Sequence, residues 1–576
     1  MCSDRFELIN TPSGLAVLDA LRTGLALFDR ERPGETPGRV VVVARNNPGV
    51  IAQAVAAHFP VSQVQLLAPK PLDERARRRV PPAVVIDICT SVDELALSIV
   101  EHPAPQLLID AIPGAGAGKV RRFRELSFAL VDGGAYLAID GAGADEGEDS
   151  LASELTRLMS LSGRATTTDE WFDLRRRDII ASVSSDGPAV LVSKSGRHYL
   201  SLREELTTPV LRRSYGTSWG AELMVRPPEK FRSKAKVTAN VQAPSEQFPD
   251  ELHVPALYLR EYVDVVCAPR QLVVRGRFVL PATFHHPSVP RPQNMSFPGS
   301  SKYFIEIDAD RGEVPLLAGT YFHLDSEYPG HFGHVFTEDI AKLWGWDIAK
   351  RRHPELRLLL SSHEESACRP APFEVEALGA YGIPEPDIVC IDHPVRVQCL
   401  VTASPQYHNG SVVYVSVRLS DTWARLRRGL RSGTGKLLER IFVARPGVQR
   451  SCVNGSRLEA TFARHGFNIV RPELLPLAEQ AELFATAPVV AGYAGSGMFN
   501  MIYSEQPGTR IVVASEEYPA RNEYLISAVK GDDFHYFSCP SRPPADPLSE
   551  IAPMHHDFEF DFDRDGDALE KLLAST

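Results

Sequence analysis

The chain has 576 residues, too many for one hydrophobic core, and this length predicts about three domains. Hydrophobic residues make up 44% and charged residues 23%, which is ordinary for a soluble globular protein. The formal charge of −11 excludes a general attraction to nucleic acid or to an anionic membrane, so any anionic ligand must be bound by a local cluster of positive groups.

No targeting or membrane-spanning segment is expected. Residues 1–7 carry no basic stretch followed by an apolar one, which a secretory signal requires. No apolar segment approaches the roughly 18 to 20 residues that span a bilayer. The eight cysteines include no Cys-x-x-Cys pair, so neither a zinc ribbon nor a disulfide framework is indicated. The sequence therefore predicts a cytoplasmic protein.

The first region, residues 1–200, alternates strand and helix patterns. Strands are expected at residues 39–44, 63–67, 83–88, 106–110 and 135–140, and helices at 14–28, 50–58, 92–100 and 119–130. Such alternation is typical of a Rossmann-like parallel sheet covered by helices on both faces. The end of the pattern, residues 107–110 and 133–140, resembles the later half of a class I S-adenosylmethionine methyltransferase.

The loop after the first strand departs from that resemblance. Methyltransferases of this class have a glycine-rich loop there, which lets the backbone approach the cofactor. This chain has Ala44-Arg45-Asn46-Asn47-Pro48-Gly49, with one glycine and one proline. We therefore expect a methyltransferase-like domain that is inactive.

The second region, residues 201–435, opens with short strand patterns at 258–266, 271–278 and 302–307 and then contains a cluster of histidines. From His334 onward the apolar positions fit a helix, so His334 and Glu338 share one side of its first turn. A histidine beside a carboxylate is suited to act as a general base. Alternatively, His331 and His334 cap the helix and bond the loop. Spacing places no third ligand, so no metal site is predicted.

The third region, residues 436–576, again alternates strands and helices. Strands are expected at 440–444, 468–470, from 489 and at 510–514, and helices at 457–465, 477–486, from 498 and at 521–530. Between the strand from 489 and the helix from Met498 stands Gly495-Ser496-Gly497. Glycines let the backbone approach a ligand, and a helix start offers free N–H groups, so a phosphate or pyrophosphate is expected here. The alternative is a tight packing turn.

Three blocks of the carboxyl-terminal half occur in the order typical of one family. They are residues 331–344, residues 440–470, and the glycine loop of residues 489–500 with Gln480, Phe484 and residues 507–509 around it. The first is a histidine-aromatic segment followed by an acid and a Lys-Leu-Trp ending. Over roughly residues 230 to 540 the chain resembles glycosyltransferase family 61, a group that includes capsular polysaccharide biosynthesis proteins.

The resemblance implies an α/β protein with a GT-B-like pair of Rossmann-like domains facing across a cleft. The expected domains are 1–200, methyltransferase-like; 201–435, acceptor-binding; and 436–576, nucleotide-sugar-binding. It further implies an inverting transfer of a hexosyl or pentosyl group from a nucleotide sugar to a glycan acceptor in cell-surface polysaccharide biosynthesis. Neither a metal nor another cofactor is required. The expected membrane contact is peripheral, through glycan-assembly machinery.

The chemistry of such a transfer assigns roles to residues. A base must take the proton of the acceptor hydroxyl, and positive or dipolar groups must stabilise the leaving nucleoside diphosphate. His334 assisted by Glu338 is the predicted base, with Asp339 as the runner-up. The residues predicted to bind the substrate or nucleotide are His331, Arg445, Arg450, Gly495, Ser496, Gly497, Asn500 and Glu516. The alternative for both arginines is surface solvation.

Two positions depart from the family pattern. Ala494 stands where the family commonly has a histidine, and Val513 where it has a glutamate, with Glu516 close behind. These departures affect donor specificity first. Two other hypotheses remain open. One is an S-adenosylmethionine-dependent methyltransferase, alone or fused to the transferase, and the other is a non-catalytic assembly protein of a glycan pathway.

Overall fold

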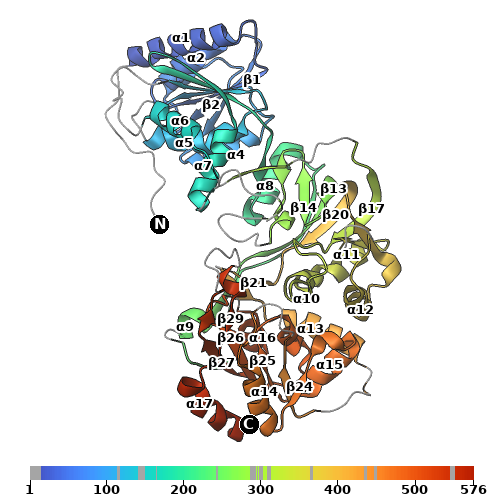
Figure 1. Ribbon diagram of the computed structural model, residues 1–576. Helices are drawn as coiled ribbons and strands as arrows, with labels where there is room; N and C mark the ends of the chain where they lie inside the picture. Colours follow the sequence, from blue (N-terminus) through green and yellow to red (C-terminus); the bar gives the residue numbers. More distant parts are fainter. Residues whose placement is uncertain are drawn as a thin grey trace. The chain divides into compact units, whose positions relative to one another are not determined.

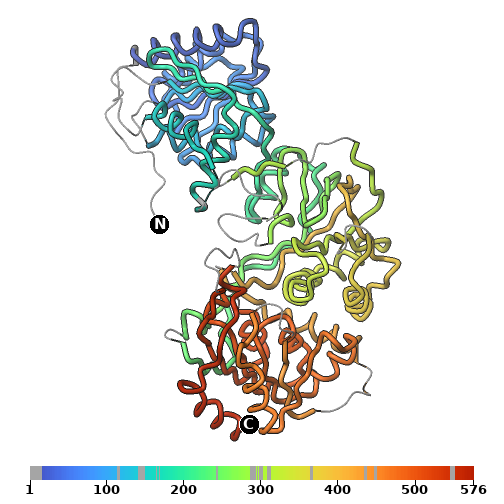
Figure 2. Tube along the Cα trace, viewed as in Figure 1, coloured from blue at the N-terminus to red at the C-terminus, as the bar shows by residue number. Residues whose placement is uncertain are grey.

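The chain forms two compact units. The computed structural model describes residues 14–112, 117–139, 150–163, 165, 167–241, 244–285, 294, 296, 303–307, 313–362, 368–410, 412–431, 433, 438–445, 450–519, 521–544 and 552–576. The first unit extends to Gly216 and also includes Val274–Pro281 and β16 (Phe304–Glu306); the second begins at Thr217 and reaches the carboxyl terminus. Figure 2 follows the chain by colour through both units.

The first unit contains a seven-stranded sheet in the order β3-β2-β1-β4-β5-β7-β6. Its strands are β1 (Arg39–Ala44), β2 (Gln63–Ala68), β3 (Val85–Ile88), β4 (Leu107–Ala111), β5 (Ala135–Ile139), β6 (Ile180–Asp186) and β7 (Ala189–Lys194). The first five are parallel, as predicted. The antiparallel β6–β7 pair was not predicted.

Helices cover this sheet on both faces (Figure 1). They are α1 (Gly14–Glu31), α2 (Pro48–His58), α3 (Glu74–Arg79), α4 (Val92–Val100), α5 (Ala117–Leu126), α6 (Leu151–Ser160) and α7 (Thr168–Asp178). Three of them begin with a capping residue whose side-chain hydroxyl accepts a hydrogen bond from a backbone N–H group of the first turn. These residues are Ser91, Ser150 and Thr167. Unit 1 also contains β8 (His198–Ser201), α8 (Glu204–Tyr215) and β15 (Phe278–Val279), which pairs with the last two residues of β14 (Leu272–Arg275).

The glycine-poor loop after β1 is used for packing. Asn47 has a left-handed backbone conformation, and Pro48 is the first residue of α2. A Cβ atom on Gly49 would lie 2.2 Å from the carbonyl oxygen of Ala76, in α3. The one glycine of this loop is therefore required for the close approach of α2 and α3.

The second unit contains two sheets, of which the first is mixed. Its strands within this unit are β9 (Gly220–Arg226), β13 (Leu257–Ala268), β17 (Leu316–His323), β18 (Arg357–Ser361), β19 (Ile388–Ile391) and β20 (Val395–Ala403). β13 runs antiparallel to β9 and β20, whereas β17, β18 and β19 continue parallel to β20. The parallel Rossmann-like pattern expected for residues 201–435 is therefore present in only part of this sheet, because β9 and β13 have one partly exposed face, which an antiparallel pair tolerates.

The second sheet of this unit is parallel, in the order β11-β27-β26-β25-β23-β24. Its strands are β11 (Lys236–Ala239), β23 (Arg440–Val443), β24 (Asn468–Val470), β25 (Val489–Tyr493), β26 (Thr509–Ser515) and β27 (Asp533–Cys539). The central strands are buried along nearly their whole length, as expected for a sheet covered on both faces. β11 comes from the predicted acceptor region and pairs with β27; neither strand was predicted.

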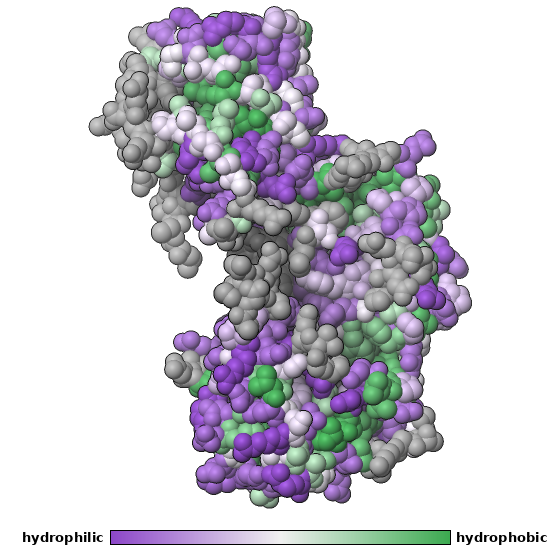
Figure 3. Space-filling view, in the orientation of Figure 1, coloured by the Kyte–Doolittle hydropathy of each residue, from purple (hydrophilic) through white to green (hydrophobic). Residues whose placement is uncertain are grey.

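Helices of the second unit pack around these sheets. They are α9 (Pro244–Gln247), α10 (Phe332–His334), α11 (Trp346–Arg352), α12 (Pro372–Tyr381), α13 (Leu419–Leu430), α14 (Gly455–Arg464), α15 (Leu477–Thr486), α16 (Asn522–Lys530) and α17 (Phe562–Ser575). The remaining strands pair as β10 (Glu229–Arg232) with β12 (Glu251–Val254), β21 (Tyr407–Asn409) with β22 (Val413–Val415), and β28 (Ser541–Arg542) with β29 (Asp557–Phe558). Hydrophilic residues occupy much of the face seen in Figure 3. Among the described helices, none is long and apolar enough to cross a bilayer.

Two predicted α-helices have other geometries. After α10 the chain makes a π-helical turn at Val335–Asp339 and then a 3-10 helix at Ile340–Gly345. Single π turns are frequent at functional sites. The helix expected from Met498 is a 3-10 helix, Ser496–Tyr503, whose residues from Met498 onward are all buried. Its packing between α15 and α16 fixes the residues that follow β25.

Candidate active site

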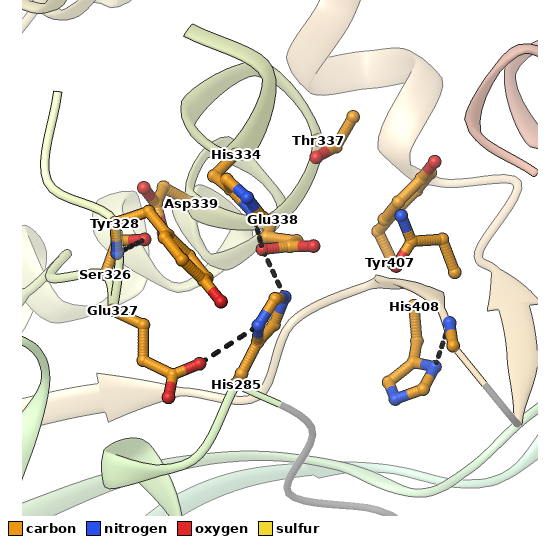
Figure 4. Close-up of polar contacts among 12 residues, drawn as sticks. His285, Ser326, Glu327, Tyr328, His334, Thr337, Glu338, Asp339, Tyr407 and His408 are labelled. Atoms are coloured by element: carbon orange, nitrogen blue, oxygen red, sulfur yellow. Dashed lines mark hydrogen bonds and ion pairs between the residues drawn. The ribbon is translucent and has the colours of Figure 1, made fainter. Parts of the chain in front are cut away.

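Four side chains form a continuous ionic network beside α10 (Figure 4). The Nδ1 atom of His334 lies 2.8 Å from Oε2 of Glu338, and Nε2 of His285 lies 2.7 Å from the same oxygen. Nδ1 of His285 lies 3.1 Å from Oε2 of Glu327. Histidines and carboxylates therefore alternate, and Glu338 is held between two imidazoles.

The network fixes the charges of its buried members. Burial would raise the pKa of Glu338, but His285 and then His334 outweigh it and hold that pKa well below its usual value. Burial lowers the pKa of His285, but Glu338 and Glu327 overcome this effect and raise it to about 10. At neutral pH Glu338 is a carboxylate and His285 an imidazolium. The side chain of His334 is 25% exposed and is the one that reaches solvent most.

Two further side chains position His334. The ring of Tyr328 stacks on its imidazole, with centroids 4.3 Å apart and planes 14° apart. The backbone N–H of His334 donates to Nδ1 of His331 at 3.4 Å. Burial, and then the neighbouring His334, lower the pKa of His331, which keeps it neutral and able to accept. The capping role foreseen for both histidines is thus observed for His331, while His334 bonds Glu338.

Asp339 points away from this network. Its carboxylate bonds Nζ of Lys342 at 3.2 Å, and both side chains are buried. Burial raises the pKa of Asp339 to about 7 against the opposing charge of Lys342. It lines a small core cavity with Glu374 and apolar side chains. The structure therefore does not bring Asp339 to the exposed edge of His334.

A cavity of about 520 Å³ adjoins the glycine loop. One wall comes from α10 and α12, and the other from the ends of β23 and β25 and from α15. The lining residues are Phe332, Pro372, Phe373, Glu376, Val443, Ala444, Arg445, Pro472, Glu473, Leu475, Pro476, Leu477, Gln480, Tyr493, Ala494, Gly495, Ser496, Gly497 and Asn500. Of the eight predicted binding residues, five line this cavity.

Two arginines lie over Gly495. A Cβ atom on Gly495 would lie 3.2 Å from Nη1 of Arg445 and 3.7 Å from Nη2 of Arg450, and its φ of 137° also favours glycine. Burial, and then the charge of Arg450, lower the pKa of Arg445 to about 10. Nε of Arg450 is buried and has no hydrogen-bond partner among the described residues. Two neighbouring guanidinium groups of this kind are suited to bind a phosphate or diphosphate.

Glu523 is the acidic neighbour of this pair. Its Oε1 accepts the N–H of Gly495 at 2.7 Å, and the residue is 2% exposed. Burial raises the pKa of Glu523 to about 7, although backbone N–H groups and both arginines act in the opposite direction. The preceding residue, Asn522, accepts a hydrogen bond from the hydroxyl group of Tyr407. Tyr407 lies beside Glu338 in Figure 4. The two charged clusters are therefore neighbours.

Close packing at Gly333 joins the histidine network to the cavity. A Cβ atom here would lie 3.1 Å from the ring of Phe499, 3.2 Å from that of His331 and 3.3 Å from Cβ of Ser496. The residue before the predicted base thus rests directly on the glycine loop.

Asn500 and Glu516 complete the predicted set. The amide of Asn500 donates to Oε1 of Gln480 at 2.9 Å and to the carbonyl of Gly497 at 3.1 Å, so it holds the loop in place. Glu516 is exposed and accepts the N–H of Ser541. It does not line the cavity. Ala494, one of the departures, uses its carbonyl oxygen to accept from Arg445, and Val513 is buried.

Sequence reasoning missed His285, Glu327, Tyr328 and Glu523. His285 stands in a Pro-rich stretch far from His334 in sequence, and the pair His285-His286 is the signal that could have flagged it. The structure thereby brings a third residue of a metal-binding type to His334 and Glu338, with ligand atoms within 4.8 Å of one another. Glu327 and Glu338 favour the protonated form of His285, and a metal ion would have to displace that proton to bind here. The expectation of no metal site therefore stays a prediction.

The amino-terminal region is similar to solved S-adenosylmethionine-dependent methyltransferases, as predicted. The MycE methyltransferase of the mycinamycin biosynthetic pathway is 12% identical, with 30% of this chain and 48% of that chain covered and a TM-score of 0.24. An O-methyltransferase family protein from Burkholderia thailandensis is 16% identical (31% and 55% covered, TM-score 0.20). Human N-acetylserotonin methyltransferase is 17% identical (30% and 51% covered, TM-score 0.20). About half of each methyltransferase is spanned, and likeness at this level carries no functional argument.

The carboxyl-terminal half has a match of its own. No curated protein sequence matches the chain significantly. The family model Glycosyltransferase 61 matches residues 332–512, a span that holds Glu338, both arginines and the glycine loop. This match confirms the predicted resemblance to glycosyltransferase family 61 for residues 332–512.

Proposed function

We propose that the chain is an inverting glycosyltransferase that moves a hexosyl or pentosyl group from a nucleotide sugar to a hydroxyl of a glycan acceptor. The contact of Gly333 with Ser496 carries this proposal. It brings a histidine–carboxylate pair beside a cavity lined by Arg445 and the glycine loop, with Arg450 close to Gly495. Such a transfer requires a general base and an anion-binding site that lie next to each other.

His334 is the general base in this proposal. A carboxylate only accepts hydrogen bonds, so Nδ1 of neutral His334 carries the proton shared with Glu338, and Nε2 keeps its lone pair. Nε2 takes the acceptor proton while the acceptor oxygen attacks the anomeric carbon. Glu338 then stabilises the imidazolium that forms, and Tyr328 holds the ring plane. His285 keeps Glu338 charged throughout.

The leaving nucleoside diphosphate is assigned to the glycine-loop cavity. Arg445 and Arg450 neutralise its charge, and the amides at Ser496 and Gly497 add their dipoles. Phe332 and Phe373 offer aromatic surface for the nucleoside, and Glu376 and Gln480 offer hydrogen-bond acceptors. The residues present need no additional cofactor for this chemistry.

The wider setting belongs to the same proposal. The two sheets of the second unit act as a GT-B-like pair, one for the acceptor and one for the donor. The enzyme works in the cytoplasm on cell-surface polysaccharide, in peripheral association with glycan-assembly machinery.

A thermal-shift screen with transfer assays tests the proposal. UDP-, GDP-, CMP- and dTDP-linked sugars are added singly, and a donor at a hundred times its Kd stabilises the fold by about 2.7 kcal/mol. We expect Arg445→Ala to abolish the shift, His334→Ala to keep the shift but lose transfer, and the control Arg396→Gln, an exposed arginine of β20, to keep both. No shift with any donor would favour the assembly-protein hypothesis. A shift with S-adenosylmethionine alone would move the activity to the first unit.

A further inference from the structure

A second cavity, of about 560 Å³, lies against residues 327–331, which precede α10. Its lining residues are Pro269, Arg270, Glu327, Tyr328, Pro329, Gly330, His331, Ser362, Ile391 and Asp392. It shares no lining residue with the glycine-loop cavity. The two cavities are lined by consecutive residues, His331 in this cavity and Phe332 in the other.

The wall of this second cavity is fixed by a buried carboxylate. Asp325 is 2% exposed; its Oδ2 accepts the N–H of Gln271 at 2.8 Å, and its Oδ1 accepts the N–H of Ser361 at 2.8 Å. Arg270 and Gln271 have consecutive left-handed backbone conformations, with φ of 65° and 75°. Such strain in two non-glycine residues persists only where surrounding bonds over-determine it, so Arg270 is held in place at the cavity.

The position of this cavity matches the geometry of an inverting transfer. The attacking oxygen and the leaving oxygen must lie on opposite sides of the anomeric carbon. In the proposed function, Arg445 and the glycine loop hold the leaving group in the first cavity. The acceptor must therefore approach from another side and still reach His334, which stacks on Tyr328 and lies with its ring centroid 4.8 Å from that of His331. Both neighbours line the second cavity.

The charged residues that line the cavity indicate which class of sugar it binds. Glu327 and Asp392 are acidic and Arg270 is basic, while burial and the neighbouring His334 lower the pKa of His331 and keep it neutral. Glu327 is paired with His285, and Arg270 balances Asp392, so the lining has no excess of positive charge that would favour an anionic sugar. Neutral hydroxyl groups, which both donate and accept, suit a lining that mixes carboxylates with a guanidinium group.

We propose that the cavity between Arg270, Tyr328 and Asp392 is the acceptor site and that it takes a neutral sugar residue. The inference rests on the proposed function and adds the place and the charge class of the acceptor.

Saturation-transfer NMR with methyl glycosides tests this site without knowledge of the donor. The probes are methyl glycosides of neutral hexoses and pentoses and the corresponding uronates. We expect the neutral glycosides to bind, and Ser362→Phe, which fills the cavity, and Arg270→Gln to weaken their binding about tenfold or more. Arg445→Ala and the exposed control Arg396→Gln should bind them as the wild type does. Unchanged binding in Ser362→Phe, preference for uronates, or no binding to the wild type would overturn the proposal.

The same proteins separate this inference from the proposed function. If no nucleotide sugar shifts the melting temperature while Ser362→Phe abolishes glycoside binding, the transferase proposal fails and the sugar site stands. If donor binding and transfer occur but Ser362→Phe leaves the acceptor KM unchanged, the transferase stands and the second cavity is not its acceptor site.

Discussion

At the scale of single residues, the histidine network depends on alternating charge. Glu338 is only 6% exposed, yet its carboxylate stays ionised because an imidazole lies on each side of it. Loss of His285 would remove the charge that stabilises this buried carboxylate most. The same carboxylate orients His334, so one residue supports both the local fold and the proposed base.

Glu338→Gln removes the charge and keeps the shape. Without the carboxylate, His334 loses the partner that stabilises its imidazolium, and we expect kcat to fall by about 10²- to 10⁴-fold. The pKa of His285 should also fall, because its largest stabilising charge is gone, and NMR titration of the imidazoles measures this.

The matched control for that variant is Glu374→Gln. Glu374 is also a buried carboxyl, but it caps α12 by accepting the N–H of Ala371 at 2.7 Å. A glutamine oxygen can accept the same bond, so kcat should change little. Equal losses of kcat in the two variants would show that Glu338 acts through stability alone.

The raised pKa of Glu523 predicts that the free energy of unfolding depends on pH. Burial raises its pKa from 4.5 to about 7, above the value in the unfolded chain. The folded state therefore binds the proton more tightly, and the contribution of this group is present below pH 4.5 and lost as the pH rises through 7. We expect the free energy of unfolding to fall by up to about 3 kcal/mol across this window. Denaturant titrations at pH 4.5, 6 and 7.5 measure it.

Glu523→Gln should remove that pH dependence while keeping the bond from Gly495. Other groups titrate as well, so the measured quantity is the difference between variant and wild type at each pH. The neighbouring Glu517→Gln, at an exposed position, should follow the wild-type curve. A constant difference between Glu523→Gln and wild type from pH 4.5 to 7.5 would contradict the assignment.

At the scale of elements, Gly333 allows α10 to rest on the glycine loop. Gly333→Ala introduces a methyl group 3.1 to 3.3 Å from Phe499, His331 and Ser496, so these neighbours must shift by a few tenths of an ångström. We expect a loss of kcat of roughly tenfold with a stability loss of about 1 kcal/mol. Steady-state kinetics and thermal unfolding measure the two effects.

Gly379→Ala is the corresponding control. Gly379 is also in a helix, α12, but a Cβ atom there would meet nothing within 4 Å. Alanine is the better helix former, so this variant should gain up to about 1 kcal/mol and keep its activity. Full activity in Gly333→Ala would show that the helix and the loop need not be in close contact.

Elements formed by local pattern were predictable from the sequence. Helix α15 and strand β24 occur at their predicted bounds, because the pattern of apolar residues alone specifies them. β11 was not predictable, since four residues become a strand only through pairing with β27, far along the chain. The π turn at Val335–Asp339 is likewise set by tertiary packing. The family-type blocks indicated His334, Glu338 and Arg445, whereas the contacts of His285 and Glu523 depend on distant segments that no spacing rule joins.

At the scale of the whole molecule, the first unit is not a simple amino-terminal domain. β8 pairs with β15 and with β16, two strands that come much later in the chain. Arg277, beside β15, donates to the carbonyl oxygens of His102 and Ala129. A boundary at residue 200, as predicted, would cut within β8. The end of α8 near Gly216 is where the contiguous part of this unit ends.

Two truncations test the consequence of this interleaving. A chain of residues 195–576 keeps β8 and α8, whereas a chain of residues 217–576 leaves β15 and β16 without the strand that joins them. Unpaired strand edges expose backbone N–H and C=O groups and promote aggregation. We therefore expect the longer truncation product to be soluble and to unfold cooperatively, and the shorter one to aggregate or to melt at a lower temperature in size-exclusion and calorimetric measurements.

The control is a chain of residues 33–576, which lacks α1 but leaves every pairing of β8 intact. If the chain of residues 217–576 is as stable and soluble as that of residues 195–576, β8 is dispensable and the carboxyl-terminal unit does not depend on the pairing of β8 with β15 and β16.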